Sequence, residues 1–190
     1  MKYLEFLKMH GTGNDFIMID GRGIDLNYKK IAPKLCLRHF GIGADGLIVL
    51  NKADNNRNDF KMRIFNSDGT EAEMCGNGIR CLTHFIKFLD LNQKKFFNIE
   101  TLAGIINSSI LSYNKDESII KVNMGKAILA KNKIPVKTNE NYNKNNIIDY
   151  KIHVHNKQFL INSVSLGNPH TVIFTDDINT IPLEKWGKAI

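Results

Sequence analysis

The sequence predicts a mixed α/β (α+β) fold that is built from two units. Three observations support this. Short apolar runs typical of strands recur along the chain, residues 76–89 have a clear helical period, and a motif near residue 14 has an echo near residue 168. We therefore expect a first domain over residues 1–125 and a similar but incomplete second domain over residues 126–190.

Strands and one helix are expected in the first third of the chain. Residues 4–20 carry a β signal that is bounded by glycine and aspartate. Residues 28–40 have helical spacing and lead into the glycine-rich segment 41–46. Two further strands are expected at 47–50 and 60–65, and the second of these alternates apolar and basic residues as a half-buried strand does.

The strongest helical signal covers residues 76–89. Its apolar residues recur at intervals of three and four, which gives one wide apolar face over about four turns. These apolar residues are Ile79, Leu82, Phe85, Ile86 and Leu89. The later strands are expected at residues 96–101, 104–113 and 118–123 in the first domain, and at 147–155, 158–165 and 171–175 in the second.

The composition suits a globular protein. The chain has 190 residues, of which 43% are hydrophobic and 24% charged, and no apolar run reaches membrane-spanning length. The net charge is +7, but the lysines are scattered and the aromatic residues lie in apolar runs, which argues against a nucleic-acid partner. An odd number of cysteines, without the density of a disulfide scaffold, favours a reducing compartment, so we expect a cytoplasmic protein.

Cys75 is the strongest candidate functional residue, because it stands directly before the helix and ends the polar loop 66–74. The first backbone N–H groups of a helix have no intrahelical partner and carry partial positive charge, so they stabilise thiolates and carboxylates. Gly76, Asn77 and Gly78 are poor helix-interior residues but allow the backbone to approach a ligand closely. The segment thus combines a proton-transfer group with an anion site, as chemistry at an amino-acid α-carbon requires.

Other motifs have ordinary structural explanations. Cys36 and Cys81 lie in apolar segments and are interpreted as small core residues. The glycine-rich segment 41–46 precedes a strand instead of linking a strand to a helix, which is the wrong context for a dinucleotide site. No metal is expected, because no histidine pair has a matching cysteine or carboxylate at metal-ligand spacing. The histidines considered are His10, His39, His84, His153 and His155.

Four segments taken together resemble the diaminopimelate epimerase family. They are residues 10–16, 38–46, 63–77 and 167–170, and they occur in the family's order. The resemblance covers essentially the whole chain, although the family continues into a second cysteine segment that this sequence does not reach. It implies two similar α/β domains, each with a curved sheet around a central helix and with the substrate between them.

The resemblance also implies a cofactor-independent epimerase that interconverts LL- and meso-2,6-diaminopimelate, for lysine and peptidoglycan precursors. By this resemblance Cys75 is one of two acid/base cysteines, and His170 lies near that pair, where an imidazole can bias the thiol/thiolate equilibrium. Gly76 and Asn77 would bind the substrate α-carboxylate. Some relatives have a substrate-contacting glutamine where this chain has Gly46. The other implied substrate-binding residues, which taken singly fit turn positions equally well, are Asn14, Asn66 and Asn168.

The chemistry leaves alternatives open. Inversion removes a proton from one face of the α-carbon and returns one to the other, and a single fixed thiol reaches only one face. Because Cys36 and Cys81 are unconvincing as a second base, the chain could instead be a truncated, non-catalytic derivative or a half-enzyme that needs a partner. A third hypothesis is a nucleophilic thiol enzyme in which His170 or His84 activates Cys75. The expected partner is the small-molecule substrate, with a homodimer left open.

Overall fold

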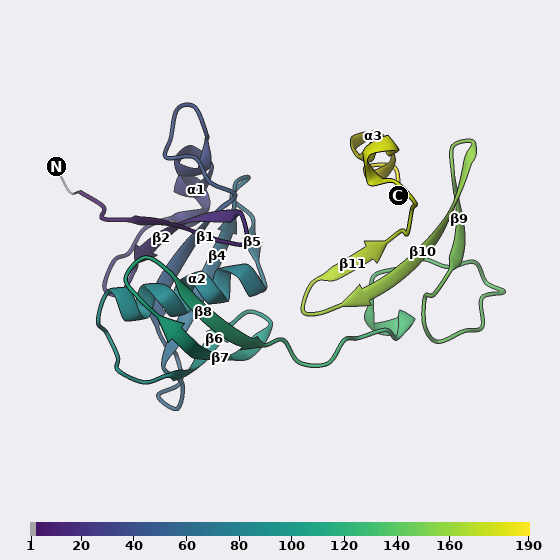
Figure 1. Ribbon diagram of the computed structural model, residues 1–190. Coiled ribbons are helices and arrows are strands. Elements are labelled where there is room, and N and C mark those ends of the chain that lie inside the picture. Colours follow the sequence, from purple (N-terminus) through teal and green to yellow (C-terminus); the bar gives the residue numbers. More distant parts are fainter. Residues whose placement is uncertain (1–2) are drawn as a thin grey trace. The chain divides into compact units, whose positions relative to one another are not determined.

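The computed structural model describes residues 3–190, which form two compact units (Figure 1). The first unit extends to Met124, and the second spans Gly125–Ile190. Residues 1–2, which fall in the predicted first domain, lie outside the described residues. Among the described residues, the first unit contains a sheet of eight strands and the second unit a sheet of three strands.

A curled sheet forms the first unit. Its strands are β1 (Leu7–Gly11), β2 (Asn14–Asp20), β3 (Gly46–Lys52), β4 (Phe60–Asn66), β5 (Glu71–Ala72), β6 (Phe96–Thr101), β7 (Gly104–Tyr113) and β8 (Ser118–Asn123). Their order in the sheet is β1-β2-β3-β4-β6-β7-β8, with β5 paired to β4. The β2–β3 and β4–β6 pairs are parallel and the other pairs are antiparallel.

Two helices cover the two faces of this sheet. Helix α2 (Gly76–Phe88) lies inside the curl and contacts β1, β2, β3, β4, β7 and β8 (Figure 1). Helix α1 (Tyr28–Cys36) packs on the outer face, against β3 and β4. Strand β2 serves both cores, because Phe16 and Met18 belong to the α2 cluster whereas Ile17 and Ile19 belong to the α1 cluster. The mixed α/β class and the curved sheet around a central helix are therefore confirmed.

Helix α1 ends at Cys36, so the expected helix over residues 28–40 is four residues too long at its C-terminus. Leu37 is extended, with φ −64° and ψ 115°. The carbonyl of Leu35 instead accepts hydrogen bonds from the N–H groups of Ile42 and Gly43, each at 2.9 Å. The chain turns back here because Arg38 leaves the helix and reaches the carboxylates of Asp15 and Asp45. This tertiary contact overrides the helical spacing.

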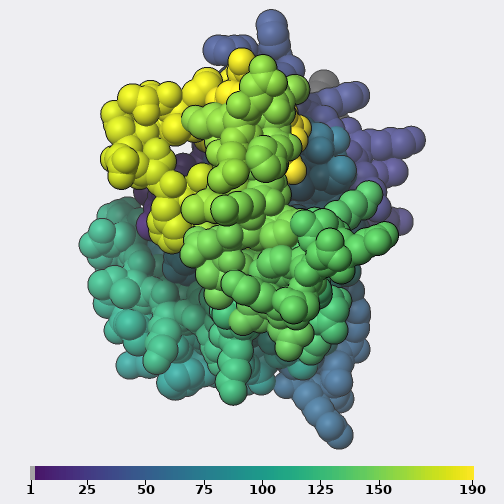
Figure 2. Space-filling view, turned by 90° about the vertical axis from the view of Figure 1, so that its right-hand side faces the viewer, coloured from purple at the N-terminus to yellow at the C-terminus, as the bar shows by residue number. Residues whose placement is uncertain are grey.

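The second unit contains a three-stranded antiparallel sheet in the order β11-β10-β9. The strands are β9 (Tyr150–Val154), β10 (Lys157–Ser165) and β11 (Pro169–Val172), and the helical elements are two 3-10 turns, Lys131–Lys133 and Ile178–Thr180, and α3 (Leu183–Gly187). Trp186 of α3 packs edge-on against Phe159 with ring centroids 5.3 Å apart. Figure 2 shows the yellow C-terminal segment beside the yellow-green strands of this unit.

Two strand predictions for the second unit are shifted. The strand expected over 147–155 begins only at Tyr150, because Asp149 has a positive φ of 50° that interrupts an extended run. The strand expected over 171–175 begins at Pro169 and ends at Val172, where its pairing with β10 ends. Neither β5 nor α3 was expected from the sequence. Among residues 3–190, no helix is both long and apolar enough to cross a membrane.

The two echoing motifs occupy matching places in antiparallel hairpins. Gly13, with φ 85°, lies in the turn between β1 and β2, and Asn14 is the first residue of β2. Gly167, with φ 108°, lies in the turn between β10 and β11, and Asn168 directly precedes β11. A glycine suits both turns, because a positive φ is strained for most other residues.

Candidate active site

Cys75 is the N-cap residue of α2. Its backbone is extended, with φ −147° and ψ 117°, and its Sγ accepts a hydrogen bond from the backbone N–H of Gly78 at 3.4 Å. Its carbonyl accepts the first intrahelical hydrogen bond, from Ile79 at 2.9 Å. The residue is half-buried. The predicted position of this thiol at a helix N-terminus is therefore confirmed.

The glycines after Cys75 let the helix mouth approach its surroundings closely. A Cβ atom at Gly78 would lie 2.8 Å from Cδ1 of Ile48, so a larger residue would push the first turn of α2 away from β3. A Cβ atom at Gly76 would lie 3.1 Å from Sδ of Met124. The N–H groups of Gly76 and Asn77 belong to the first turn, where no intrahelical carbonyl can bond them. They are suitable donors for a carboxylate.

The side-chain amide of Asn14 connects Cys75 to the sheet. Its Oδ1 lies 3.8 Å from Sγ of Cys75 and accepts a hydrogen bond from Nδ2 of Asn77 at 3.2 Å. Its Nδ2 donates to Oδ2 of Asp45 at 2.8 Å. The structure thus brings Asn14 to Cys75 and Asn77, which lie about 60 residues later in the sequence.

A network of charged side chains holds this end of β2. Arg38 donates to both carboxylate oxygens of Asp15, at 3.0 and 3.2 Å, and to Oδ1 of Asp45 at 2.6 Å. Nζ of Lys8 lies 3.1 Å from the Asp15 carboxylate. The Arg38 guanidinium holds the pKa of Asp15 well below its ordinary value, so this carboxylate is charged at neutral pH. The network joins β1, β2 and the segment before β3.

Asn66 lies at the same end of the sheet. It is the last residue of β4 and pairs with Gly46, the first residue of β3, which in turn pairs with Phe16 of β2. Its Nδ2 donates to Oγ1 of Thr70 at 2.9 Å, and its side chain is exposed. A Cβ atom at Gly46 would lie only 2.9 Å from the carbonyl oxygen of Phe65, so this backbone does not accommodate a side chain there.

The other two predicted site residues belong to the second unit. Nε2 of His170 lies 3.2 Å from Oδ1 of Asn168. Both residues are exposed, at the turn between β10 and β11. The structure therefore groups the predicted residues as five in the first unit and two in the second.

Cys36 and Cys81 are buried, which confirms the prediction that they are core residues. Burial raises the pKa of Cys36 to about 11 and that of Cys81 to about 12. Both thiols therefore stay protonated near neutral pH.

The histidines of the first unit do not contact Cys75 by hydrogen bonding. Within residues 3–190 its Sγ has Asn14 and Gly78 as partners. His84 instead has Nδ1 2.9 Å from Oγ of Ser118, and burial lowers its pKa. The hypothesis of a nucleophilic thiol activated by His84 thus has no geometric support. The described residues contain no group of three or more His, Cys, Asp or Glu side chains that could hold a metal ion.

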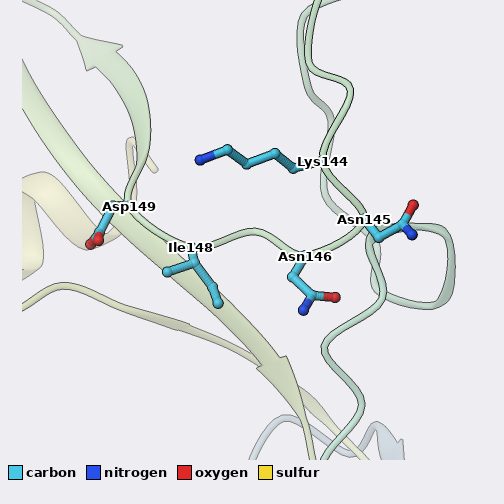
Figure 3. A pocket seen from close by; sticks show the side chains of 5 residues that line it. All are labelled: Lys144, Asn145, Asn146, Ile148 and Asp149. Carbon is cyan, nitrogen blue, oxygen red and sulfur yellow. The ribbon is translucent and has the colours of Figure 1, made fainter.

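Each unit has a surface hollow. One, of about 410 Å³, is in the second unit and is lined by Lys144, Asn145, Asn146, Ile148 and Asp149 (Figure 3). The other, of about 670 Å³, is in the first unit, and its lining includes Arg80, Cys81 and His84. Cys75 lines neither of them. The site around Cys75 is thus defined by its polar contacts.

The diaminopimelate epimerase family model matches residues 6–130. The chain belongs to the diaminopimelate epimerase family. It is 52% identical over 190 residues to the diaminopimelate epimerase of Halothermothrix orenii, and 44% identical over 191 residues to that of Carboxydothermus hydrogenoformans. Each alignment covers 98% of this chain and 66% of the relative, so the chain spans just under two thirds of the length of these diaminopimelate epimerases.

Solved structures show that the fold extends beyond diaminopimelate epimerases. A probable proline racemase from Agrobacterium radiobacter K84 matches with a TM-score of 0.72 over 94% of this chain and 54% of its own, at 13% identity. A hydroxyproline epimerase from Agrobacterium vitis matches with a TM-score of 0.67 over 90% of this chain and 51% of its own, at 12% identity. At these identities the likeness concerns the fold.

Three of the side chains around Asn14 and Asn77 were not foreseen from the sequence as site residues. Asp45 and Arg38 lie in the segment 38–46, whose sequence indicates a glycine-rich motif in the wrong context for a dinucleotide and a part of the family resemblance. Arg80, which donates to Oδ1 of Asn77, was not singled out at all. A usable signal existed for Asp45, because a polar residue directly before a buried strand lies at the sheet edge where sites form.

Proposed function

We propose that this chain acts in the cofactor-independent epimerisation of 2,6-diaminopimelate, interconverting the LL and meso forms for lysine and peptidoglycan precursors. The observation that carries the proposal is the position of Cys75, whose sulfur lies at the N-terminus of α2 beside the amide of Asn14, which in turn accepts a hydrogen bond from Asn77. Membership of the diaminopimelate epimerase family supports the same reaction. The comparisons do not favour the alternative of a non-catalytic derivative.

In this proposal Cys75 exchanges the α-proton of the substrate on one face of the α-carbon. The first-turn N–H groups of Gly76 and Asn77 bind the α-carboxylate, where negative charge builds up as the proton leaves. Donors that are already oriented lower the energy of that charge without rearrangement. Asn14, Asn66 and Asn168 hold the other polar groups of the substrate. No pyridoxal phosphate takes part.

Two-base chemistry needs a second group on the opposite face. Cys36 and Cys81 do not suit this role, because both are buried and burial raises the pKa of each thiol to about 11 and about 12 respectively. We therefore assign Cys75 to one face only. His170 is proposed to bias the thiol/thiolate equilibrium of the reacting cysteines. Its imidazole contacts Asn168, a proposed substrate-binding residue, and this contact supports the proposal.

The proposed function also includes a cellular compartment, a domain arrangement and an oligomeric state. The substrate is a small molecule, and the expected compartment is the cytoplasm, in keeping with three free cysteines. We take residues 1–125 and 126–190 as the two domains of the family architecture. A homodimer is the assembly to test first, and sedimentation of the purified chain would measure it.

Proton exchange in D₂O tests the proposal. We expect LL-diaminopimelate to gain deuterium at the α-carbon, and NMR measures the rate of this gain. Cys75→Ser should slow the exchange by at least about 100-fold, because a serine hydroxyl still caps the helix but is a far weaker acid than a thiol. Cys36→Ala removes a thiol elsewhere in the first unit and should keep the exchange. A folded wild-type chain that neither exchanges nor inverts the substrate would contradict the proposal, as would full activity in Cys75→Ser.

A further inference from the structure

Two asparagine side chains beside Cys75 lie in a directed chain of hydrogen bonds with a basic end and an acidic end. Arg80 donates to Oδ1 of Asn77. Nδ2 of Asn77 donates to Oδ1 of Asn14 at 3.2 Å, and Nδ2 of Asn14 donates to Oδ2 of Asp45 at 2.8 Å. Each member therefore donates to the next, from Arg80 to Asp45.

The two charged ends determine which way each amide points. An ionised carboxylate only accepts hydrogen bonds, so Asp45 can face only the NH₂ group of Asn14. A guanidinium only donates, so Arg80 can face only the carbonyl oxygen of Asn77. Turning either amide over would set donor against donor or acceptor against acceptor, which leaves polar groups unpaired. The orientation of both amides is therefore fixed from both ends.

Each end of the chain is itself anchored. Oδ1 of Asp45 accepts a hydrogen bond from Arg38 at 2.6 Å, and its Oδ2 also accepts one from the backbone N–H of Asp15 at 3.1 Å. Arg80 also donates to Oγ1 of Thr12 at 3.2 Å, in the turn between β1 and β2. Neither charged group can swing away without losing a second partner.

The orientation of Asn14 decides what the sulfur of Cys75 meets. In the observed orientation the carbonyl oxygen of Asn14 lies 3.8 Å from Sγ, so the thiol has a hydrogen-bond acceptor. If the amide turned over, its NH₂ group would face the sulfur instead, and a donor favours the thiolate over the thiol. The amide of Asn14 thus controls the polarity of the environment of Cys75.

We propose that Asp45 is a positioning residue for the reacting thiol, because it holds Asn14 with its carbonyl oxygen towards Cys75. Asp45 touches neither the sulfur nor the substrate in this proposal, and it acts through Asn14. The inference rests on the proposed function only in taking Cys75 as the reacting thiol. Among the described residues, Arg80 reaches this site through its hydrogen bond to Asn77. Cys81 on α2 interacts electrostatically with Cys75, and its thiol is protonated because burial raises its pKa to about 12.

A double-mutant cycle, read by the alkylation of Cys75 with iodoacetamide across pH, tests this role without any substrate. Asp45→Asn lets residue 45 offer either a donor or an acceptor, so Asn14 is then held only from the Asn77 end and turns over more readily. We expect the midpoint of the pH profile to move to lower pH and the rate at neutral pH to rise about threefold. In an Asn14→Ala background, Asp45→Asn should change the rate by less than about 1.5-fold, because the amide through which it acts is gone.

Two further variants separate positioning from charge. Asp45→Glu keeps the charge but displaces the carboxylate by one methylene, and we expect it to move the profile in the same direction as Asp45→Asn. Asp20→Asn removes a carboxylate that pairs with Arg22 at the other end of β2, and it should leave the profile in place. If Asp45→Asn fails to fold, as judged by circular dichroism, Asp45→Glu in the two backgrounds provides the same cycle.

Failure of the positioning role of Asp45 can be told apart from failure of the proposed epimerisation. An unchanged profile in the Asp45 variants, or an equal shift with and without Asn14, would overturn the positioning role. If the wild-type chain shows no α-proton exchange but the cycle behaves as expected, the proposed reaction is wrong and the role of Asp45 stands. Exchange without the expected cycle would instead reject only the role of Asp45.

Discussion

The N-terminus of α2 and the middle of the same helix each contain a cysteine, and the two have different environments. Cys75 is half-buried, accepts a backbone N–H and lies beside the amide of Asn14. Cys81 is 4% exposed among apolar side chains, and burial raises its pKa to about 12. The same residue type is a candidate acid/base at one place and a core residue at the other. What differs is access to unpaired N–H groups and to solvent.

Alkylation of the native protein should separate the two thiols most strongly. At mildly alkaline pH we expect iodoacetamide to modify Cys75 at least about 100-fold faster than Cys81, because burial keeps Cys81 both protonated and inaccessible. Mass spectrometry of the digested protein measures the two rates. Cys36, also buried, is the internal control and should behave like Cys81. Comparable rates at Cys75 and Cys81 would remove the basis of the comparison.

Serine substitutions should separate the two positions by stability. Cys81→Ser places a hydroxyl among apolar side chains, and we expect it to lower the free energy of unfolding by about 2 kcal/mol. Cys75→Ser should change it by less than about 0.5 kcal/mol, because serine is a good N-cap residue. Urea unfolding followed by circular dichroism measures both values. Cys81→Ala, which buries no polar group, is the matched control. Equal losses at both positions would show that Cys75 is also a packing residue.

At about pH 9 the pH dependence of stability is the smallest expected effect, and it grows at higher pH. Because burial raises the pKa of Cys81 to about 12 in the folded state, against about 8.5 in an unfolded chain, the folded state binds more protons in this range. The resulting stability is complete below about pH 8.5 and is lost as the pH rises towards about 12, by at most about 1.4 kcal/mol per pH unit. Urea titrations should show a shallower decline in Cys81→Ala. An identical slope would contradict the burial effect.

Much of the first unit could be predicted because its elements are specified locally. The strands at 96–101, 104–113 and 118–123 have the predicted bounds, since turn residues delimit each of them. The start of α2 was predicted from the change to a helical period after Cys75. The end of α1 was not, because the chain leaves the helix for a tertiary contact of Arg38.

The candidate site could be predicted only in part, for a similar reason. The position of Cys75 follows from its neighbours in sequence. The contact of Asn14 with Asp45 depends on the parallel register of β2 and β3, in which Phe16 pairs with Gly46. Register across parallel strands is set by packing on both faces of the sheet, so the sequence of either strand alone does not reveal it.

The most direct test of the account is the initial rate of α-deuterium incorporation into LL-diaminopimelate by three proteins: wild type, Cys75→Ser and Cys81→Ala. If the first turn of α2 carries the proton transfer, Cys75→Ser loses the exchange by at least about 100-fold and Cys81→Ala keeps it. If Cys75→Ser retains the wild-type rate in a folded protein, the proton is moved by another group and the central claim is wrong.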